Sequence, residues 1–166
     1  MTRLTRREAL WGGAAAAAAA GLSLAAGVAS AASAQTRRFP VTRTDAEWRR
    51  TLSPSAYAVL RRGSTERPGS SPLNRERRRG TYHCAGCGHR LFASAAKFES
   101  GTGWPSFTAP LAGGIGTRPD DSGFGRRTEV HCARCGGHLG HVFDDGPRPT
   151  GKRYCMNGAA LAFRPG

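Results

Sequence analysis

The chain has 166 residues, a net charge of +14 and 39% hydrophobic residues, which excludes a multi-span membrane protein and makes disorder throughout the chain an unsuitable description. Lysine and arginine number 25 against 11 aspartates and glutamates, so we expect a soluble surface that attracts anions. The 23 glycines and 10 prolines favour short strands and turns over a helical bundle.

The start of the chain is typical of an export signal and not of a folded segment. Arg6 and Arg7 precede an uncharged, alanine-rich stretch of residues 9–36, which is the pattern of a twin-arginine signal. Small residues at its end predict cleavage after Ala34, hence a signal peptide at 1–34 and a protein of the periplasm. The alternative is an uncleaved membrane anchor, which the weakly apolar alanines disfavour.

One domain is expected after the leader, at 45–166, with residues 35–44 as a linker. Between residues 35 and 80 there are twelve arginines against four acids. The run Arg75–Arg79 has two interpretations, a nucleic-acid patch and a solvated arm, of which the solvated arm is the more common.

Two short helices are expected to flank the start of this domain. Asp45 can cap a helical turn that continues through Trp48. The Ser53-Pro54 pair can begin a second helix, in which Tyr57 and Leu60 share one face.

From residue 81 onward the pattern changes to short segments that are separated by glycine and proline. Such segments are typical of strands in an antiparallel, turn-rich sheet. They are Tyr82–Cys84, Arg90–Phe92, Arg127–His131 and Leu161–Phe163. The glycine-dense residues 113–116 lack the context of a phosphate-binding turn and are interpreted as a flexible loop. We therefore expect a mainly β domain.

Four of the five cysteines form two matched pairs, each with two residues between the cysteines and a glycine directly after. The pairs are Cys84 with Cys87 and Cys132 with Cys135. Each turn directs two thiolates at one ion, and the glycine adopts backbone angles that a side chain would obstruct. Together they predict one structural zinc per chain, with no position open for substrate. Because 44 residues separate the pairs, we expect two hairpins that zinc clips together in one sheet.

Two disulfides are the alternative for an exported protein. A disulfide within so closely spaced a pair is strained, and two of them in one chain would be unusual. Iron is a further alternative and less common than zinc. The twin-arginine route carries folded proteins, so the metal site could form in the reducing cytoplasm before export.

The fifth cysteine, Cys155, stands apart from both pairs and is the candidate nucleophile. Arg153 lies two positions before it, on the same face of an expected strand, and Asn157 lies two positions after. A cation and an imidazole can stabilise a thiolate, so His138 and His141 are candidate active-site residues beside Cys155. The alternatives are a buried, inert thiol and histidines that bind zinc or face solvent. Since four cysteines already fill a structural site, we interpret the histidines as catalytic.

Four motifs together resemble peptide-methionine (R)-S-oxide reductase, the B family. They are Gly101–Phe107, Arg127–Val130, His138–Pro147 and Arg153–Asn157. The resemblance runs from about residue 45 to residue 163. It implies two antiparallel sheets with flanking helices, zinc on the paired cysteines, and reduction of methionine-R-sulfoxide to methionine.

The resemblance also implies roles for single residues. Cys155 matches the nucleophile and Trp104 the wall of a pocket for the substrate methyl group. The polar and charged groups of the active site are His138, His141, Arg153 and Asn157. Thr102 stands where many members carry a resolving cysteine, so an external thiol is needed as the reductant, such as a thioredoxin-like protein or a small thiol. Gly158 stands where serine is common, a change expected to cost little.

In the expected mechanism the Cys155 thiolate attacks the sulfoxide sulfur while His138 or His141 protonates the oxygen. Methionine leaves and Cys155 becomes a sulfenic acid. One rival function is a zinc-ribbon module that binds nucleic acid through its arginines, and another is a zinc-stabilised domain without chemistry. The export signal and the few aromatic residues disfavour the first rival, so we expect no nucleic-acid partner. We expect a monomer.

Overall fold

The computed structural model describes residues 39–122 and 125–166, which fall within one unit that spans Thr36–Gly166. The signal peptide expected at 1–34 lies outside the described residues. Within the described part, none of the helices combines the length and the apolar character needed to cross a membrane.

The first helix, α1 (Asp45–Thr51), begins one residue earlier than the sequence indicates. Its N-cap is Thr44, whose hydroxyl accepts a hydrogen bond from the Glu47 amide while the Glu47 carboxylate accepts one from the Thr44 amide. This reciprocal capping box satisfies two backbone donors at the helix start. The expected cap, Asp45, instead lies in the first turn, where its carboxylate pairs with Arg49 at 2.8 Å.

The second helix, α2 (Pro54–Arg62), begins at the expected Ser53-Pro54 pair. It ends at Gly63, which adopts a left-handed φ of 67° that favours glycine. Tyr57 and Leu60 are both buried, as the pattern predicts. This buried face packs against strand β7, so the helix covers one side of the sheet that carries the candidate site.

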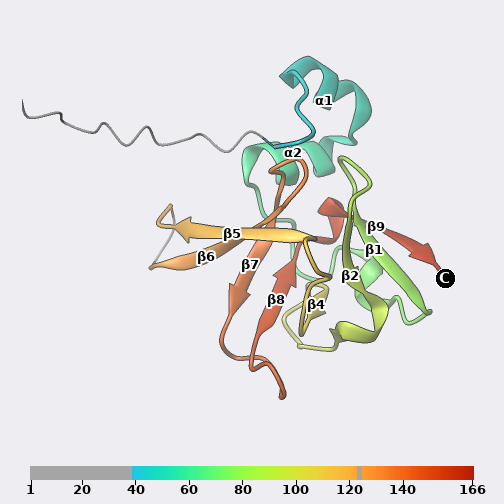
Figure 1. Ribbon diagram of the computed structural model, residues 1–166, viewed down its shortest axis with the longest axis vertical. Helices are drawn as coiled ribbons and strands as arrows, with labels where there is room; N and C mark the ends of the chain where they lie inside the picture. Colours follow the sequence, from blue (N-terminus) through green and yellow to red (C-terminus); the bar gives the residue numbers. More distant parts are fainter. Residues whose placement is uncertain (1–38, 123–124) are drawn as a thin grey trace, which may run out of the picture. The chain divides into compact units, whose positions relative to one another are not determined.

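In the part of the chain that the structure describes, nine strands form two antiparallel sheets (Figure 1), which confirms the expected mainly β fold with two short helices. The three-stranded sheet has the order β2-β1-β9, with β1 Gly80–Cys84, β2 Arg90–Ala93 and β9 Leu161–Pro165. The six-stranded sheet has the order β3-β4-β8-β7-β6-β5. Its strands are β3 Lys97–Phe98, β4 Ser106–Phe107, β5 Ile115–Asp120, β6 Arg127–Cys132, β7 His138–Phe143 and β8 Arg153–Met156. Short 3₁₀ turns connect β2 to β3 at Ser94–Ala96 and β8 to β9 at Gly158–Ala160, and a third, at Pro72–Arg75, lies between α2 and β1.

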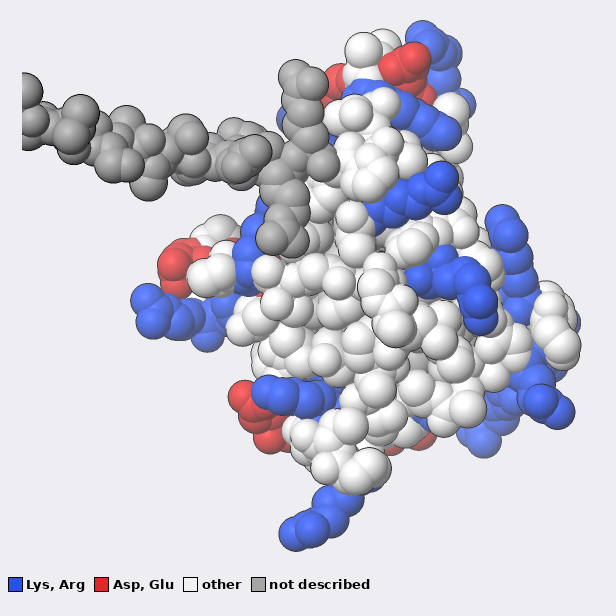
Figure 2. All heavy atoms as spheres, in the orientation of Figure 1, with Lys and Arg blue, Asp and Glu red and all other residues white. Residues whose placement is uncertain are grey.

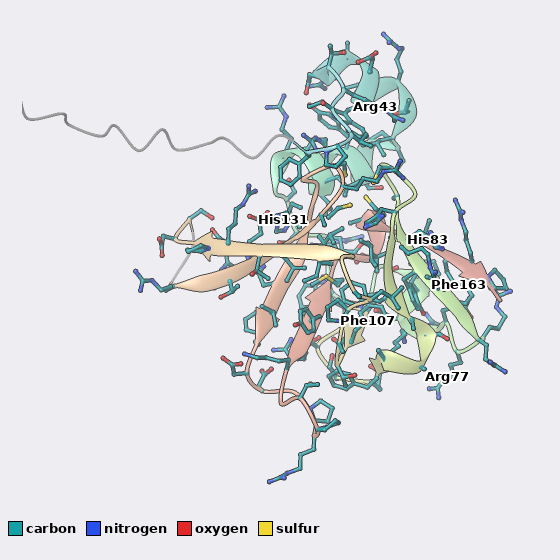
Figure 3. The ribbon with its side chains drawn as sticks, viewed as in Figure 1. Arg43, Arg77, His83, Phe107, His131 and Phe163 are labelled. Carbon is teal, nitrogen blue, oxygen red and sulfur yellow. The ribbon has the colours of Figure 1, made fainter. Side chains whose placement is uncertain are left out.

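Aromatic residues from both sheets pack together in the core. Phe107 of β4 stacks on Phe92 of β2 with ring centroids 4.3 Å apart, and it meets Tyr82 of β1 edge-on at 4.9 Å. All three side chains are fully buried. Figure 3 labels Phe107 near the centre of the molecule, where the two sheets approach each other. Truncation of one such ring to alanine costs about 3–5 kcal/mol, so this cluster joins the sheets firmly.

Residues 39–44, which fall within the expected linker, lie against the domain. The Val41 amide donates to the Arg134 carbonyl over 2.9 Å. The Phe39 ring lies edge-on to His131, with centroids 5.6 Å apart. A Cβ on Gly136 would lie 2.3 Å from the Phe39 ring, so this glycine is needed for the close approach.

Among the charged side chains on the face drawn in Figure 2, basic ones predominate, over the helices and over the side formed by β1 and β9. The run Arg75–Arg79 begins at the last residue of a 3₁₀ turn and ends just before β1, and its four arginines are exposed. Arg78 pairs with Glu76 over 2.6 Å. This exposure agrees with the interpretation of the run as a solvated arm.

Candidate active site and metal site

The four paired cysteines meet at two turns that belong to different sheets. Cys84 and Cys87 lie at the turn between β1 and β2, and Cys132 and Cys135 lie at the turn between β6 and β7. Their four sulfur atoms all lie within 4.8 Å of one another. An ion bound here would therefore join the two sheets, whereas the sequence suggested two parts of one sheet.

The spacing of the sulfur atoms fits a tetrahedral thiolate site. The sulfurs of Cys84 and Cys135 are 3.7 Å apart, and those of Cys87 and Cys132 are 3.5 Å apart. Zinc–sulfur bonds of about 2.3 Å would separate the ligands of a tetrahedral ion by roughly 3.8 Å. All four thiols are free, and these close approaches run between the pairs, which is not the arrangement that two disulfides within the pairs would give. The cluster can hold a metal ion.

The ionisation of these thiols also favours a bound cation. Hydrogen bonds from the neighbouring thiols lower the pKa of Cys132 to about 7 and lower that of Cys87 as well. The same contacts raise the pKa of Cys84. Two of the sulfurs thus ionise readily, and a nearby positive charge is needed before all four can do so.

Cys155 lies apart from this cluster, on β8 in the six-stranded sheet. Its half-buried side chain lines a cavity of about 150 Å³. Three of the expected site residues line the same cavity, namely Trp104, His141 and Asn157. His138 does not line it.

His141 is placed beside Cys155 by the pairing of β7 with β8, in which these two residues are direct partners. The neighbouring Gly140 allows the strands to approach, because a Cβ there would lie 2.1 Å from the Cys155 carbonyl oxygen. The Nε2 atom of His141 lies 2.6 Å from the Asp120 carboxylate. Burial lowers the pKa of His141, and the hydrogen bond to Asp120 opposes this shift in part.

A register shift places His138 on the same face as His141, although the two are three residues apart. Val130 pairs with Gly140, but the next residue, His131, pairs with His138. One residue of β7 between these two pairs therefore has no partner on β6. This β-bulge places the His138 side chain on the same face of the sheet as that of His141. The two imidazole rings meet edge-on with centroids 5.4 Å apart.

His138 makes its hydrogen bond away from Cys155. Its Nδ1 lies 2.9 Å from the Glu129 carboxylate, and its buried Nε2 has no hydrogen-bond partner within the described residues. Burial raises the pKa of Glu129, but hydrogen bonds from His138 and Arg118 outweigh burial and bring it to about 2. Glu129 is thus ionised at neutral pH and keeps a proton on Nδ1 of His138.

Arg153 lies on the same face of β8 as Cys155, as expected from their spacing. Its guanidinium binds the Asp145 carboxylate through two contacts of 2.8 and 2.7 Å, and its carbon lies 4.4 Å from the centre of the Phe143 ring. The hydrogen bond to Asp145 is the main cause of the raised pKa of Arg153, and the Cys155 sulfur adds to it. A fixed positive charge is therefore held within reach of the sulfur.

Asn157 and Trp104 are both held by the backbone around Glu66. The Asn157 side chain accepts a hydrogen bond from the Glu66 amide at 3.0 Å and donates one to the Leu139 carbonyl at 3.1 Å. The Trp104 indole donates to the Glu66 carbonyl at 3.2 Å. Asn157 is 3% exposed, so its amide mainly fixes the segments around the cavity.

Sequence reasoning missed several residues of this site. Arg127 and Phe143 line the Cys155 cavity, and Asp120 and Glu129 contact the two histidines. Glu66 fixes Asn157. The motifs that carry the family resemblance contain Arg127, Glu129 and Phe143 and could have drawn attention to them. No pattern in the sequence singled out Asp120 or Glu66.

A half-buried cysteine that shares a cavity with an imidazole, next to a guanidinium and separate from a four-cysteine cluster, is the arrangement expected of a thiol-dependent oxidoreductase. Residues 52–165 match the SelR domain family. A protein from Bradyrhizobium diazoefficiens named peptide methionine sulfoxide reductase MsrB is 56% identical over 126 residues, which cover 75% of this chain and 91% of that protein. Proteins of the same name from Leptospira interrogans and Agrobacterium fabrum are 49% and 50% identical, over 76% and 75% of this chain and 97% and 93% of their own lengths.

The chain therefore belongs to the B family of peptide methionine sulfoxide reductases, as its motifs predicted, and it is an oxidoreductase of that class.

Proposed function

We propose that the protein reduces methionine-R-sulfoxide in peptides and proteins to methionine, with Cys155 as the nucleophile. The observation that carries this proposal is that Cys155, His141 and Trp104 line one cavity. A nucleophile, a proton donor and an apolar wall are the three groups that reduction of a sulfoxide requires. The cavity volume of about 150 Å³ suits the end of a methionine side chain.

In the first step the Cys155 thiolate attacks the sulfoxide sulfur, and the oxygen receives one proton. The oxygen passes to Cys155, which becomes a sulfenic acid, and methionine leaves. The substrate sulfur is reduced by two electrons and the cysteine sulfur is oxidised by two. The single proton balances the charge of the thiolate, so an acid must stand beside the reacting atoms.

His141 is the better placed of the two candidate acids. It lines the cavity and faces Cys155 across the strand pair, whereas His138 is bound to Glu129 outside the cavity. Asp120 accepts a hydrogen bond from His141 and so favours its protonated form. Arg153 stabilises the thiolate before the attack through its positive charge.

The arrangement of the cavity also supports selection of the R epimer. Trp104 offers an apolar surface to the substrate methyl group, while His141 offers a proton to the oxygen. In the S epimer the methyl group and the oxygen exchange places, so one of these two contacts is lost.

Recycling of the sulfenic acid is proposed to use an external thiol, such as a thioredoxin-like protein or a small thiol. Thr102 places its hydroxyl oxygen 3.8 Å from the Cys155 sulfur, in the position where a resolving cysteine would be in contact. A hydroxyl cannot form a disulfide, and the other four thiols lie in the metal cluster. The external thiol attacks the sulfenic sulfur and releases water. A second thiol then reduces the mixed disulfide.

We propose that the four-cysteine cluster binds one zinc ion per chain and that this ion is structural. Thiolate is the preferred ligand of structural zinc, and four thiolates leave no coordination position for substrate. Cys84, Cys87, Cys132 and Cys135 would hold it, while the chemistry of the sulfoxide takes place at Cys155.

Export by the twin-arginine route to the periplasm and a monomeric state complete the proposal. The support for export is the adjacent Arg6 and Arg7 ahead of an uncharged stretch. The mass of the protein recovered from the periplasm should match a chain that begins at Gln35. An Arg6→Lys, Arg7→Lys variant should remain in the cytoplasm. Sedimentation equilibrium should give the mass of one chain.

The activity is tested with a peptide that contains methionine-R-sulfoxide, an excess of dithiothreitol and mass spectrometry. The zinc-loaded protein should remove one oxygen from this peptide and leave the matched S-epimer peptide unchanged. Cys155→Ser should abolish the reaction, while Cys155→Ser and the parent chain should hold the same amount of metal. Turnover by Cys155→Ser would contradict the proposal.

A further inference from the structure

Three hydroxyl groups connect a fully buried position to the sulfur of Cys155. The Ser106 hydroxyl donates to the Trp104 carbonyl over 3.1 Å, and its oxygen lies 2.7 Å from that of Ser100. The Ser100 oxygen lies 2.8 Å from the Thr102 hydroxyl, which in turn lies 3.8 Å from the Cys155 sulfur. Ser106 is fully buried and is the direct partner of Cys155 across β4 and β8.

The number of available protons decides which hydroxyl donates and which accepts in each of these hydrogen bonds. Each hydroxyl has one proton to donate. Because Ser106 uses its proton on the Trp104 carbonyl, the contact between Ser106 and Ser100 needs the proton of Ser100. The contact between Ser100 and Thr102 then needs the proton of Thr102. The Thr102 oxygen is left as an acceptor, and it can accept from the Cys155 thiol.

Ionisation of Cys155 reverses only the last of these hydrogen bonds. A thiolate cannot donate, so the Thr102 hydroxyl rotates about its own C–O bond and donates to the sulfur. The Ser100 oxygen still accepts a hydrogen bond after this rotation, because the Thr102 amide also donates to it over 3.4 Å. The new hydrogen bond involves a charged acceptor, and such bonds are stronger than neutral ones.

We propose that Thr102 is a further catalytic residue, whose hydroxyl holds the reacting sulfur in both protonation states and stabilises the thiolate by donating to it. Ser100 and Ser106 are positioning residues that hold the Thr102 hydroxyl as an acceptor while Cys155 is a thiol. The inference rests on the proposed role of Cys155 as the nucleophile and adds a second group, after Arg153, that favours its ionised form. Thr102 then has a function of its own and does not merely stand where other members carry a resolving cysteine.

Two variants should shift the ionisation of Cys155 in opposite directions. Thr102→Val keeps the shape of the side chain and removes the donor to the thiolate, so the pH midpoint of Cys155 alkylation should rise by about one unit, which corresponds to about a tenfold change in the ionisation equilibrium. Ser100→Ala removes the acceptor that competes for the Thr102 proton in the thiol state, so the midpoint should fall. A purely structural disturbance would not produce opposite signs.

The experiment measures the rate of iodoacetamide alkylation of Cys155 against pH in the full-length, zinc-loaded protein, with the modified residue identified by mass spectrometry. Thr102→Ser keeps the hydroxyl and should keep the parent midpoint. Thr108→Val removes a hydroxyl that bonds a backbone carbonyl elsewhere, and it serves as the matched control.

A parent midpoint in Thr102→Val, or a rise in both Thr102→Val and Ser100→Ala, would overturn the inference. Alkylation requires no sulfoxide, so this outcome is independent of whether the protein reduces methionine sulfoxide. If Thr102→Val does not fold, the direction of the Ser100→Ala shift alone decides.

Discussion

His141 and Cys155 are direct partners on the adjacent antiparallel strands β7 and β8, so their side chains project from the same face of the sheet. The Cβ atoms of such partners lie about 4.5–5.5 Å apart. The separation of the proposed acid from the proposed nucleophile is thus set by backbone hydrogen bonds and not by a loop. Rigid elements hold reacting groups more accurately than loops do, which favours efficient proton transfer.

Replacement of His141 should impair the reaction more than replacement of any other histidine. His141→Gln removes the acid from the Cys155 cavity and should lower kcat by about 10²-fold to 10⁴-fold, the usual range for general acid catalysis. His138→Gln should have a smaller effect, because His138 lies outside that cavity. His89→Gln is the control, since His89 is half-buried outside the Cys155 cavity and contacts the Gly113 carbonyl. A larger loss in His138→Gln would assign the proton to His138 instead.

The pH dependence of the rate should follow the protonation of His141. Burial lowers the pKa of His141 below its ordinary value of about 6.5, while the hydrogen bond to Asp120 raises it in part. The acid form is lost as pH rises through this pKa, so kcat/KM should fall on the alkaline side. Asp120→Asn removes the group that favours the protonated ring and should move this fall to lower pH. A shift of the fall to higher pH in Asp120→Asn would show that another group is the acid.

The elements of the fold that local chemistry controls could be read from the sequence, and those that depend on distant contacts could not. The Ser53-Pro54 pair marks the start of α2 because a cap and a proline act within one turn. Thr44, and not Asp45, is the cap of α1, because Thr44 and Glu47 each accept a hydrogen bond from the other's backbone amide. The placement of the two cysteine pairs on different sheets follows from the strand order, which no local pattern encodes.

The same division applies to the candidate site. The spacing of Arg153 and Cys155 along one strand was enough to place them on one face. The common face of His138 and His141 could not be derived in that way, because a regular strand sends residues three apart to opposite faces. The bulge in β7 changes this, and its position is fixed by pairing with β6. Asp120 reaches His141 from the far end of β5, a contact that only the folded sheet creates.

Removal of the proposed zinc ion should destabilise the whole domain. The cluster joins the turn of β1 and β2 to that of β6 and β7, so loss of the ion frees the sheets from each other at one end. Four buried or half-buried thiols would then lack the cation that stabilises their ionised forms. A chelator should lower Tm by more than 10 °C, on the order expected for several kcal/mol in a domain of this size. Cys135→Ser should lose the metal and show a similar fall in Tm.

The control for this prediction is Cys155→Ser, which lies outside the cluster and should keep one zinc per chain. Metal content is measured by inductively coupled plasma mass spectrometry, together with a count of thiols that react in the native protein. The parent protein should contain one zinc ion and one reactive thiol per chain, and Cys155→Ser should contain one zinc ion and no reactive thiol. An unchanged Tm after complete removal of the metal would contradict a structural role.

Gly158 should be intolerant of a side chain, although the family resemblance gives serine as common at this position. A Cβ on Gly158 would lie 2.0 Å from the hydroxyl oxygen of Ser71 and 2.4 Å from its Cβ, so Ser71 or the turn at Gly158–Ala160 must move. The Gly158 amide donates to Glu66 over 2.6 Å, so a displaced turn would also disturb the segment that holds Trp104 and Asn157. Gly158→Ser should therefore lower the free energy of unfolding by about 1–3 kcal/mol, the usual cost of overpacking.

The double variant Ser71→Gly, Gly158→Ser separates this steric cause from other effects of the new hydroxyl. Ser71→Gly removes the two nearest atoms that the Cβ would meet and leaves the Glu66 carboxylate oxygen as the nearest, at 3.2 Å, so the cost of Gly158→Ser should be much smaller in that background. The comparison uses urea denaturation of the four proteins of the cycle, because coupling between the two positions appears as non-additivity. Additive costs would show that contact with Ser71 is not the reason for glycine at 158.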